Sequence, residues 1–259
     1  MDRLPPPVRR VLAQWLGEVL GLFGRHVESV LLFGGVALGE FAPRWSDIDV
    51  AAALGRAPDP TEVRRLGEIQ SALHDRYVHG AEGGWASEQL VEGVFVLTPM
   101  LTSAEGRGPG CEVETDAVRY LEDVSLEPFD RLVIARHALV LLGGPCLVAP
   151  PTEEALRAQL RRDLDRLELK GNPTPVWQAG MLHWGARSLR YWRDGVITSK
   201  GQALEHEARR GGPLAQAFRF AATCRDDGPS ACRSRADEVS AVFEGAKPLL
   251  IAALTPFAG

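Results

Sequence analysis

Two aspartates separated by one residue follow a pair of glycines early in the chain, and residues of these types at this spacing can hold a metal ion. Gly34-Gly35 is followed by ten residues and then by Ser46-Asp47-Ile48-Asp49. Side chains alternate between the two faces of a strand, so both carboxylates point to the same side, with their α-carbons about 7 Å apart. Mg²⁺ takes oxygen ligands and usually shares them between one or two carboxylates and substrate phosphates. An isolated Asp-x-Asp more often ends a surface loop, but the glycine pair at this distance favours a divalent-metal site.

Two apolar strands must present these residues. Residues 30–33 form a continuous apolar run, which is typical of a strand covered on both faces. Gly34-Gly35 removes two β-carbons where that strand ends, so the backbone can bend sharply and another group can approach closely. The second strand opens at Ser46-Asp47, and Ile48 is predicted to point into the core. A helix over residues 8–23, a helix beginning at Asp59-Pro60-Thr61 and a third strand over residues 89–98 are predicted beside them.

The rest of the chain divides into a connector and a helical region. Residues 102–116 are rich in glycine and acidic residues and are predicted to form a loop at the rim of the sheet. Residues 129–142 are predicted as a helix, or as a helix followed by a strand. Pro150-Pro151 marks a boundary between a domain at 1–150 and a domain at 151–259. The second domain is predicted to be all-helical, with helices near 153–169, 176–194, 199–210, 213–224 and 233–254.

The glycine pair and the Ser-Asp-Ile-Asp motif resemble the nucleotidyltransferase superfamily, whose signature is Gly-[Gly/Ser] followed by Asp-x-Asp. Within it, the chain is most similar to the aminoglycoside 3''-adenylyltransferases, which inactivate streptomycin and spectinomycin. Those enzymes usually carry a serine where this chain has Gly35, and other branches of the superfamily have Gly-Gly there. The resemblance implies an α+β fold, in which an N-terminal nucleotidyltransferase domain with a mixed sheet and flanking helices precedes an all-helical domain.

The resemblance also implies a third carboxylate, on the strand that follows the Asp-x-Asp strand. Glu92 is the carboxylate embedded in the predicted third strand, and we expect it to fill this role. Glu88 and Glu114 remain alternatives. On this view Asp47, Asp49 and Glu92 are the catalytic and metal-binding residues.

Two cations in the helical region complete the implied site. The family carries a leucine-rich helix with an arginine, a turn and then a lysine, and Arg187 and Lys200 stand at a matching spacing. In the family these cations contact ATP phosphates from the second domain, so substrates would lie in a cleft between the domains. Lys200 also follows a plausible helix N-cap, Ser199. Gly34, Gly35 and Ser46 are expected to contact the same nucleotide.

The implied function is Mg²⁺-dependent transfer of AMP from ATP to a hydroxyl of a small, aminoglycoside-like molecule, with release of pyrophosphate. Positioning and charge neutralisation provide most of the acceleration in such chemistry. Two alternatives remain at this point: a nucleotidyltransferase that acts on protein or RNA, and a nucleotide-binding sensor with weak catalysis.

We expect streptomycin to be a poor acceptor. The resistance enzymes recognise it with an acidic residue before the arginine-bearing helix and with a tryptophan in the first domain. Residues 172–180 contain no carboxylate here, and residues 106–121 contain no tryptophan. Each charge-assisted hydrogen bond that is lost is worth about 1.5–3 kcal/mol.

Charge, apolar content and cysteine spacing exclude several classes of binding partner for this chain. The net charge of −5 disfavours nonspecific binding to nucleic acid, which needs a basic footprint. No stretch reads as a signal peptide, and none reaches the uninterrupted apolar length of a membrane span. The four cysteines match no zinc spacing. We therefore expect a cytoplasmic protein that binds neither membrane nor nucleic acid. The resemblance implies ATP, Mg²⁺ and a small hydroxylated, cationic substrate as partners, and we expect a monomer.

Overall fold

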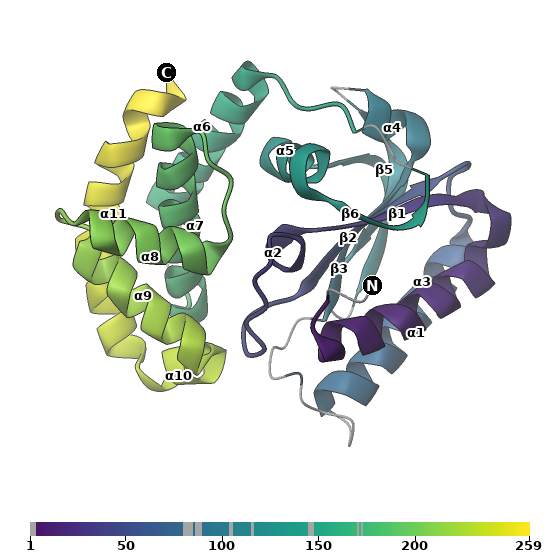
Figure 1. Cartoon of the computed structure of the whole chain (residues 1–259), viewed down its shortest axis with the longest axis horizontal. Helices are drawn as coiled ribbons and strands as arrows, with labels where there is room; N and C mark the ends of the chain where they lie inside the picture. Colours follow the sequence, from purple (N-terminus) through teal and green to yellow (C-terminus); the bar gives the residue numbers. More distant parts are fainter. Residues whose placement is uncertain are drawn as a thin grey trace. The chain divides into compact units, whose positions relative to one another are not determined.

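A mixed β-sheet forms the centre of the N-terminal part of the chain, and helices form the C-terminal part (Figure 1). The structure is a computed structural model that describes residues 4–79, 85, 90–103, 106–114, 117–144, 148–169, 171 and 173–259. The chain divides into two compact units, Met1–Thr152 and Glu153–Gly259, here called the sheet unit and the helical unit. The α+β fold class that the resemblance implies is confirmed.

The sheet has the strand order β5-β4-β3-β2-β1-β6 among the described residues. Its central neighbours β2 and β3 run parallel, and every other neighbouring pair is antiparallel. The parallel pair follows from the long connection between them, which contains a helix. The strands are β1 (Val27–Phe33), β2 (Ile48–Leu54), β3 (Val91–Leu97), β4 (Arg107–Val113), β5 (Val118–Ser125) and β6 (Leu139–Gly143).

Two helices cover one face of this sheet: α1 (Pro6–Phe23) and α3 (Pro60–His74) lie side by side there (Figure 1). Asp59 begins α3 as predicted, because its side chain accepts hydrogen bonds from the amides of Thr61 and Glu62 while the Glu62 side chain bonds back to the Asp59 amide. The predicted helix over 8–23 is also confirmed. The remaining helical segments of the unit are Gly24–His26, α2 (Gly34–Ala37), Asp75–His79, α4 (Thr98–Thr102) and α5 (Pro128–His137).

The predicted loop over residues 102–116 is wrong, because the structure forms strand β4 there and pairs it with β3 and β5. The glycines in this stretch allow close packing. A β-carbon at Gly110 would lie 2.3 Å from the carbonyl oxygen of Phe95, and one at Gly106 would lie 1.7 Å from that of Met100. Glycines in a strand often mark a place where another backbone segment packs closely against it, as happens here, and they need not indicate a loop.

The helical unit follows the predicted pattern with one correction. The helix predicted over 233–254 is two helices that meet at Arg235, and the second of them continues to Ala258. The described helices of the unit are α6 (Glu153–Leu169), α7 (Pro175–Asp194), α8 (Lys200–Arg210), α9 (Ala215–Asp227), α10 (Pro229–Ser234) and α11 (Ala236–Ala258).

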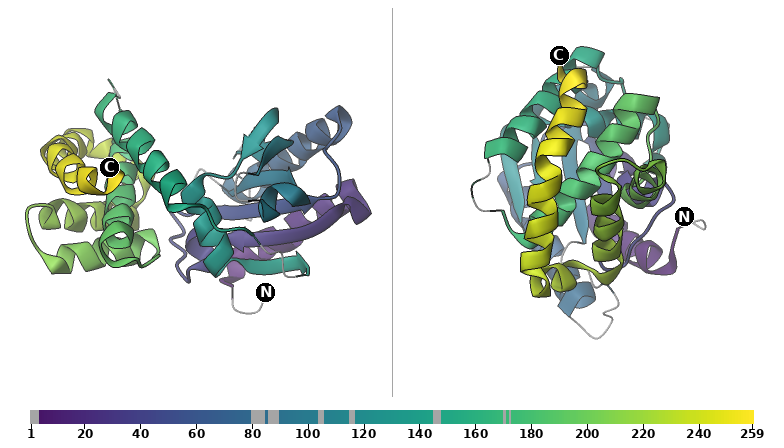
Figure 2. Two further views of the ribbon diagram at one scale, coloured as in Figure 1. Left: turned by 90° about the horizontal axis from the view of Figure 1, so that it is seen from above. Right: turned by 90° about the vertical axis from the view of Figure 1, so that its left-hand side faces the viewer.

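Helix α11, drawn in yellow in Figure 2, packs against α6, α7 and α9. Phe243, Leu250 and Leu254 on this helix are buried in the core of the unit. By length and composition alone α11 could cross a membrane, because an 18-residue window has a mean hydropathy of 1.3, although Glu244 and Lys247 interrupt its apolar sequence. A core helix passes the same test, so this is weak support for a membrane span.

Candidate active site

Three carboxylates point to one face of the sheet, at the start of β2 and β3. Asp49 and Glu92 are register partners on these parallel strands, so their side chains point to the same face from neighbouring strands about 4.8 Å apart. Asp47 directly precedes β2, and the partial exposure of Asp47 and Asp49 alternates with the complete burial of Ile48 and Val50. This alternation places Asp47 on the same side. The structure therefore places on one side of the sheet the three carboxylates that we expected to act as one site, and their joint role stays a prediction.

These carboxylates face away from the core under α1 and α3. Ile48, Val50 and Val91 belong to the apolar cluster that contains Trp15 and Leu66 from those two helices. Residues at alternate positions on the same strands point to the other face. The three acids are thus held by a rigid apolar layer behind them while their own side stays accessible.

Gly34 lies against the carboxylate of Asp49. It follows β1, whose Phe33 pairs with Asp49, and it has a φ of 65°. A β-carbon at position 34 would lie only 1.7 Å from Oδ2 of Asp49. The group that approaches this glycine within the chain is therefore the Asp49 side chain. A β-carbon at Gly35 would meet the Glu40 carbonyl oxygen at 3.4 Å, which is a much looser contact.

Ser46 organises the loop that leads into β2. Its side chain is buried, and its hydroxyl oxygen accepts a hydrogen bond from the Ala42 amide at 3.0 Å. The Ser46 amide donates to the Ala42 carbonyl at 2.7 Å. These two bonds fix the turn just before Asp47, and the expected contact of Ser46 with the nucleotide stays a prediction.

Glu88 and Glu114 were the alternatives to Glu92 as the third carboxylate. Glu88 lies outside the described residues. Glu114 accepts a hydrogen bond from Arg119 at 2.6 Å, and Arg119 also pairs with Glu112 at 3.2 Å. Glu114 is thus held in an exposed ion-pair group of the β4–β5 hairpin, whereas Glu92 has Asp49 as its strand neighbour. This geometry favours Glu92 as the third carboxylate.

The two predicted phosphate-binding cations lie on successive helices of the helical unit. Arg187 is half-buried on α7, and Lys200 is the first residue of α8. Ser199 caps α8: its hydroxyl accepts from the Gln202 amide, and the Gln202 side chain accepts from the Ser199 amide. The predicted N-cap is therefore confirmed, and it fixes the backbone that carries Lys200.

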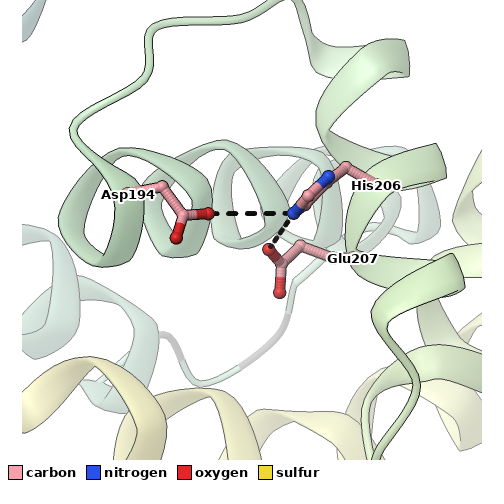
Figure 3. Close-up of side chains that lie close together, drawn as sticks. All are labelled: Asp194, His206 and Glu207. Atoms are coloured by element: carbon pink, nitrogen blue, oxygen red, sulfur yellow. Dashed lines mark ion pairs between the residues drawn. The ribbon is translucent and has the colours of Figure 1, made fainter.

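The helical unit also contains a charged group that the sequence did not reveal, formed by Asp194, His206 and Glu207 (Figure 3). Nε2 of His206 lies 3.7 Å from Oδ2 of Asp194 and 3.8 Å from Oε1 of Glu207. Asp194 ends α7, and the other two residues lie on α8. By residue type alone these side chains could hold a metal ion.

Three arginines make this group a poor cation site. Arg193 pairs with buried Glu207 at 2.8 Å, Arg190 bonds to Asp194 and lies 2.9 Å from Nε2 of His206, and Arg210 pairs with Asp194 at 3.4 Å. Two carboxylates among three guanidinium groups leave the group positively charged when His206 is neutral. We conclude that these ion pairs join α7 to α8. Only the Arg190–Asp194 spacing of four residues on one helix is a signal visible in the sequence.

His183 is fully buried on α7, and its Nε2 lies 3.1 Å from the carbonyl oxygen of Ala221. Burial, with a smaller contribution from Arg225, lowers the pKa of His183 to about 3. The imidazole is therefore neutral near pH 7 and serves packing.

The sequence matches no protein-family model and no curated protein sequence. Among solved structures, the chain is similar to the spectinomycin adenyltransferase AAD(9) from Enterococcus faecialis, determined with ATP and spectinomycin. The TM-score is 0.67, the match covers 91% of this chain and 99% of that chain, and the sequence identity is 8%. At this identity the similarity shows the fold, which is the one that the resemblance predicted.

Proposed function

We propose that the chain is a Mg²⁺-dependent adenylyltransferase that moves AMP from ATP to a hydroxyl of a small, aminoglycoside-like molecule. The observation that carries this proposal is the pairing of Asp49 with Glu92 on neighbouring parallel strands, with Asp47 on the same side. The shared fold with a structure that holds ATP and spectinomycin supports the choice of nucleotide and of acceptor class.

The donor set fits magnesium. Three partly exposed carboxylates provide only oxygen ligands, which is what this hard cation prefers. Asp47 and Asp49 would hold the ion together with triphosphate oxygens, and Glu92 would complete the set or act as general base. Bound there, Mg²⁺ would neutralise charge on the triphosphate and stabilise the attacking and leaving oxygens.

The reaction places simple demands on the chain's own residues. The acceptor oxygen forms a bond to the α-phosphorus while the bond from that phosphorus to pyrophosphate breaks. The acceptor hydroxyl loses its proton, and Glu92 would take it as general base. Arg187 and Lys200 would bind the phosphates that depart, since guanidinium and ammonium groups both donate to phosphate oxygens.

The direct test is pyrophosphate release by the purified chain with ATP and Mg²⁺. Spectinomycin, streptomycin and an unrelated aminoglycoside should be compared as acceptors. We expect turnover with at least one hydroxylated cationic acceptor and little or none with streptomycin. Absence of acceptor-dependent pyrophosphate across a broad panel would contradict the proposal, and efficient turnover of streptomycin would contradict the expected selectivity.

Replacing either aspartate tests the metal site. Asp47→Asn and Asp49→Asn keep side-chain size but remove the negative charge, so Mg²⁺-dependent turnover should fall at least about 100-fold, as for other losses of transition-state charge stabilisation. Circular dichroism should show an unchanged fold, because both residues are partly exposed. Wild-type turnover by either variant would show that the metal site is assigned wrongly.

Replacing the two cations tests the phosphate contacts. Arg187→Ala and Lys200→Ala should each weaken ATP binding about 10-fold, which corresponds to the loss of one charge-assisted hydrogen bond. The double variant should lose less than the sum of the two free-energy changes, because both residues would act on one triphosphate. Arg209, an exposed cation on the same helix as Lys200, provides the matched control Arg209→Ala. ATP affinity equal to wild type in both single variants would remove Arg187 and Lys200 from the site.

A further inference from the structure

Gln70, on α3, is a buried side chain whose amide group is bonded at both ends. It is 3% exposed, and its Oε1 accepts a hydrogen bond from Nε1 of Trp15 at 3.2 Å. Its Nε2 donates to the carbonyl oxygen of Val91 at 2.8 Å and to that of Glu114 at 3.4 Å. A buried amide that lost these partners would pay the full desolvation cost of its polar atoms, so the contacts fix its orientation.

The two carbonyl oxygens that Gln70 bonds lie just past the end of the β3–β4 pairing. The last register pair at that end is Gly93 with Val113. Continuing the antiparallel register by one residue places Glu92 opposite Glu114. Gln70 therefore bridges the two strands beside Glu92, just beyond the last described register pair of β3 and β4.

The other side of β3 is held by β2. Val91 pairs with Ile48, and the Ile48 amide donates to the Leu90 carbonyl at 2.8 Å. The start of β3 is thus held by β2 on one side, and on the other side, among the described residues, by the Gln70 side chain of α3. That side chain lies on the apolar face of the sheet, while Glu92 points to the opposite face.

We propose that Gln70 is a positioning residue for Glu92. It holds the peptide that precedes Glu92 from behind the sheet and so sets the distance between the Glu92 and Asp49 carboxylates. This inference rests on the proposed function, in which Glu92 completes the metal site or accepts a proton. Gln70 itself touches neither substrate nor metal and acts only through the backbone of Val91.

The test compares two matched substitutions. Gln70→Met keeps the length of the side chain and removes its donors. Gln178→Met makes the same change at another buried glutamine, which accepts from Ser240 in the helical unit. Misplacing a catalytic group by about 1 Å costs on the order of 100-fold, so kcat of Gln70→Met should fall between about 10- and 100-fold. Its KM for ATP should change less than about threefold, because the phosphate contacts are untouched. Gln178→Met should keep kcat even where its melting temperature drops equally.

A double-mutant cycle separates positioning from general stability. In a Glu92→Gln background, adding Gln70→Met should change the residual single-turnover rate less than about twofold, since the group that Gln70 positions is already altered. Gln70→Leu provides a second variant, because it also removes the amide donors while keeping an uncharged side chain of similar size, and it should lose kcat as Gln70→Met does.

Three results would overturn the inference. One is a kcat for Gln70→Met within threefold of Gln178→Met, and another is a full additional loss in the Glu92→Gln background. The third is loss of cooperative unfolding in both Gln70 variants, which would show that Gln70 holds the whole unit together. Failure of the wild-type chain to transfer AMP would instead reject the proposed function, so the two failures are distinguishable.

Discussion

At the scale of single residues, the contact between Gly34 and Asp49 couples the end of one strand to the start of the next. The carboxylate occupies the space that any larger residue at position 34 would need. A substitution at Gly34 should therefore act on the Asp49 carboxylate, although glycine itself contributes no functional group.

Gly34→Ala should displace the Asp49 carboxylate and reduce activity nearly as far as Asp49→Asn does. The backbone at position 34 also has a positive φ, which an alanine adopts at a cost of about 1–2 kcal/mol. Gly39→Ala is the matched control, because Gly39 has a φ of 80° but open space around its α-carbon. Turnover and urea unfolding should be measured for both. Equal activity in the two variants would show that backbone strain alone matters at Gly34.

The sequence was sufficient to predict Asp47 and Asp49 as neighbours, because strand periodicity relates them directly. It was not sufficient to place Glu92 beside Asp49, since that needs the register between two strands more than thirty residues apart. Gln70 gave no signal at all, because a polar residue on a predicted helix is usually exposed. Long-range register and buried polar contacts are the parts of this site that local patterns do not encode.

At the scale of secondary-structure elements, Arg131 on α5 organises the passage from α4 to β4. Its guanidinium group is buried and donates to the carbonyl oxygens of Leu101, Ser103, Met100 and Gly106. Burial lowers the pKa of Arg131 from its ordinary value. One side chain thus provides the hydrogen bonds that this turn cannot make within itself.

Arg131→Met should destabilise the sheet unit by about 2–4 kcal/mol, because it leaves several buried carbonyl groups without their donor. Arg136→Met on the same helix is the control, since Arg136 is exposed and such changes usually stay within about 0.5 kcal/mol. Urea unfolding followed by circular dichroism measures both. A difference below 1 kcal/mol between the two variants would contradict the role given to Arg131.

The β4–β5 hairpin shows why the loop predicted over residues 102–116 was wrong. Gly108, Pro109 and Gly110 have poor strand propensity, and they indicate a loop when read locally. Pairing with β3 outweighs that preference, because the missing β-carbons let β4 lie tightly against Phe95 and Met100. By contrast, the Asp59 cap and the amphipathic helices were predictable because their signals are contained within one turn or one helix face.

At the scale of the whole molecule, buried His183 makes stability depend on pH in a defined direction. Its folded pKa of about 3 lies below the ordinary value of 6.5. Between these values the unfolded chain binds a proton that the folded chain does not, so stability falls as the pH drops below 6.5. The slope is about 1.4 kcal/mol per pH unit. The Arg56 hydrogen bond lowers the pKa of Glu62, so that carboxyl loses its contribution only at lower pH.

We therefore expect the free energy of unfolding to fall by about 2 kcal/mol between pH 6.5 and pH 5 because of His183. His183→Gln keeps a donor for the Ala221 carbonyl and removes the titration, so its stability should vary less over this range. Chemical denaturation of both proteins at several pH values provides the comparison. The same pH dependence in both would show that His183 is not the responsible group.

Helix α11 has a consequence for how the protein is made. It is synthesised after every other described helix of its unit, and its Phe243, Leu250 and Leu254 belong to the core that those helices share. A ribosome adds about 5–20 residues per second, so synthesis from Glu153 to Gly259 takes roughly 5–20 s. From its own synthesis until α11 follows, each of α6, α7 and α9 lacks the apolar side chains of α11 that pack against it. The core of the helical unit is therefore complete only once α11 has docked, whereas the sheet unit precedes it in the chain and shares none of its core cluster.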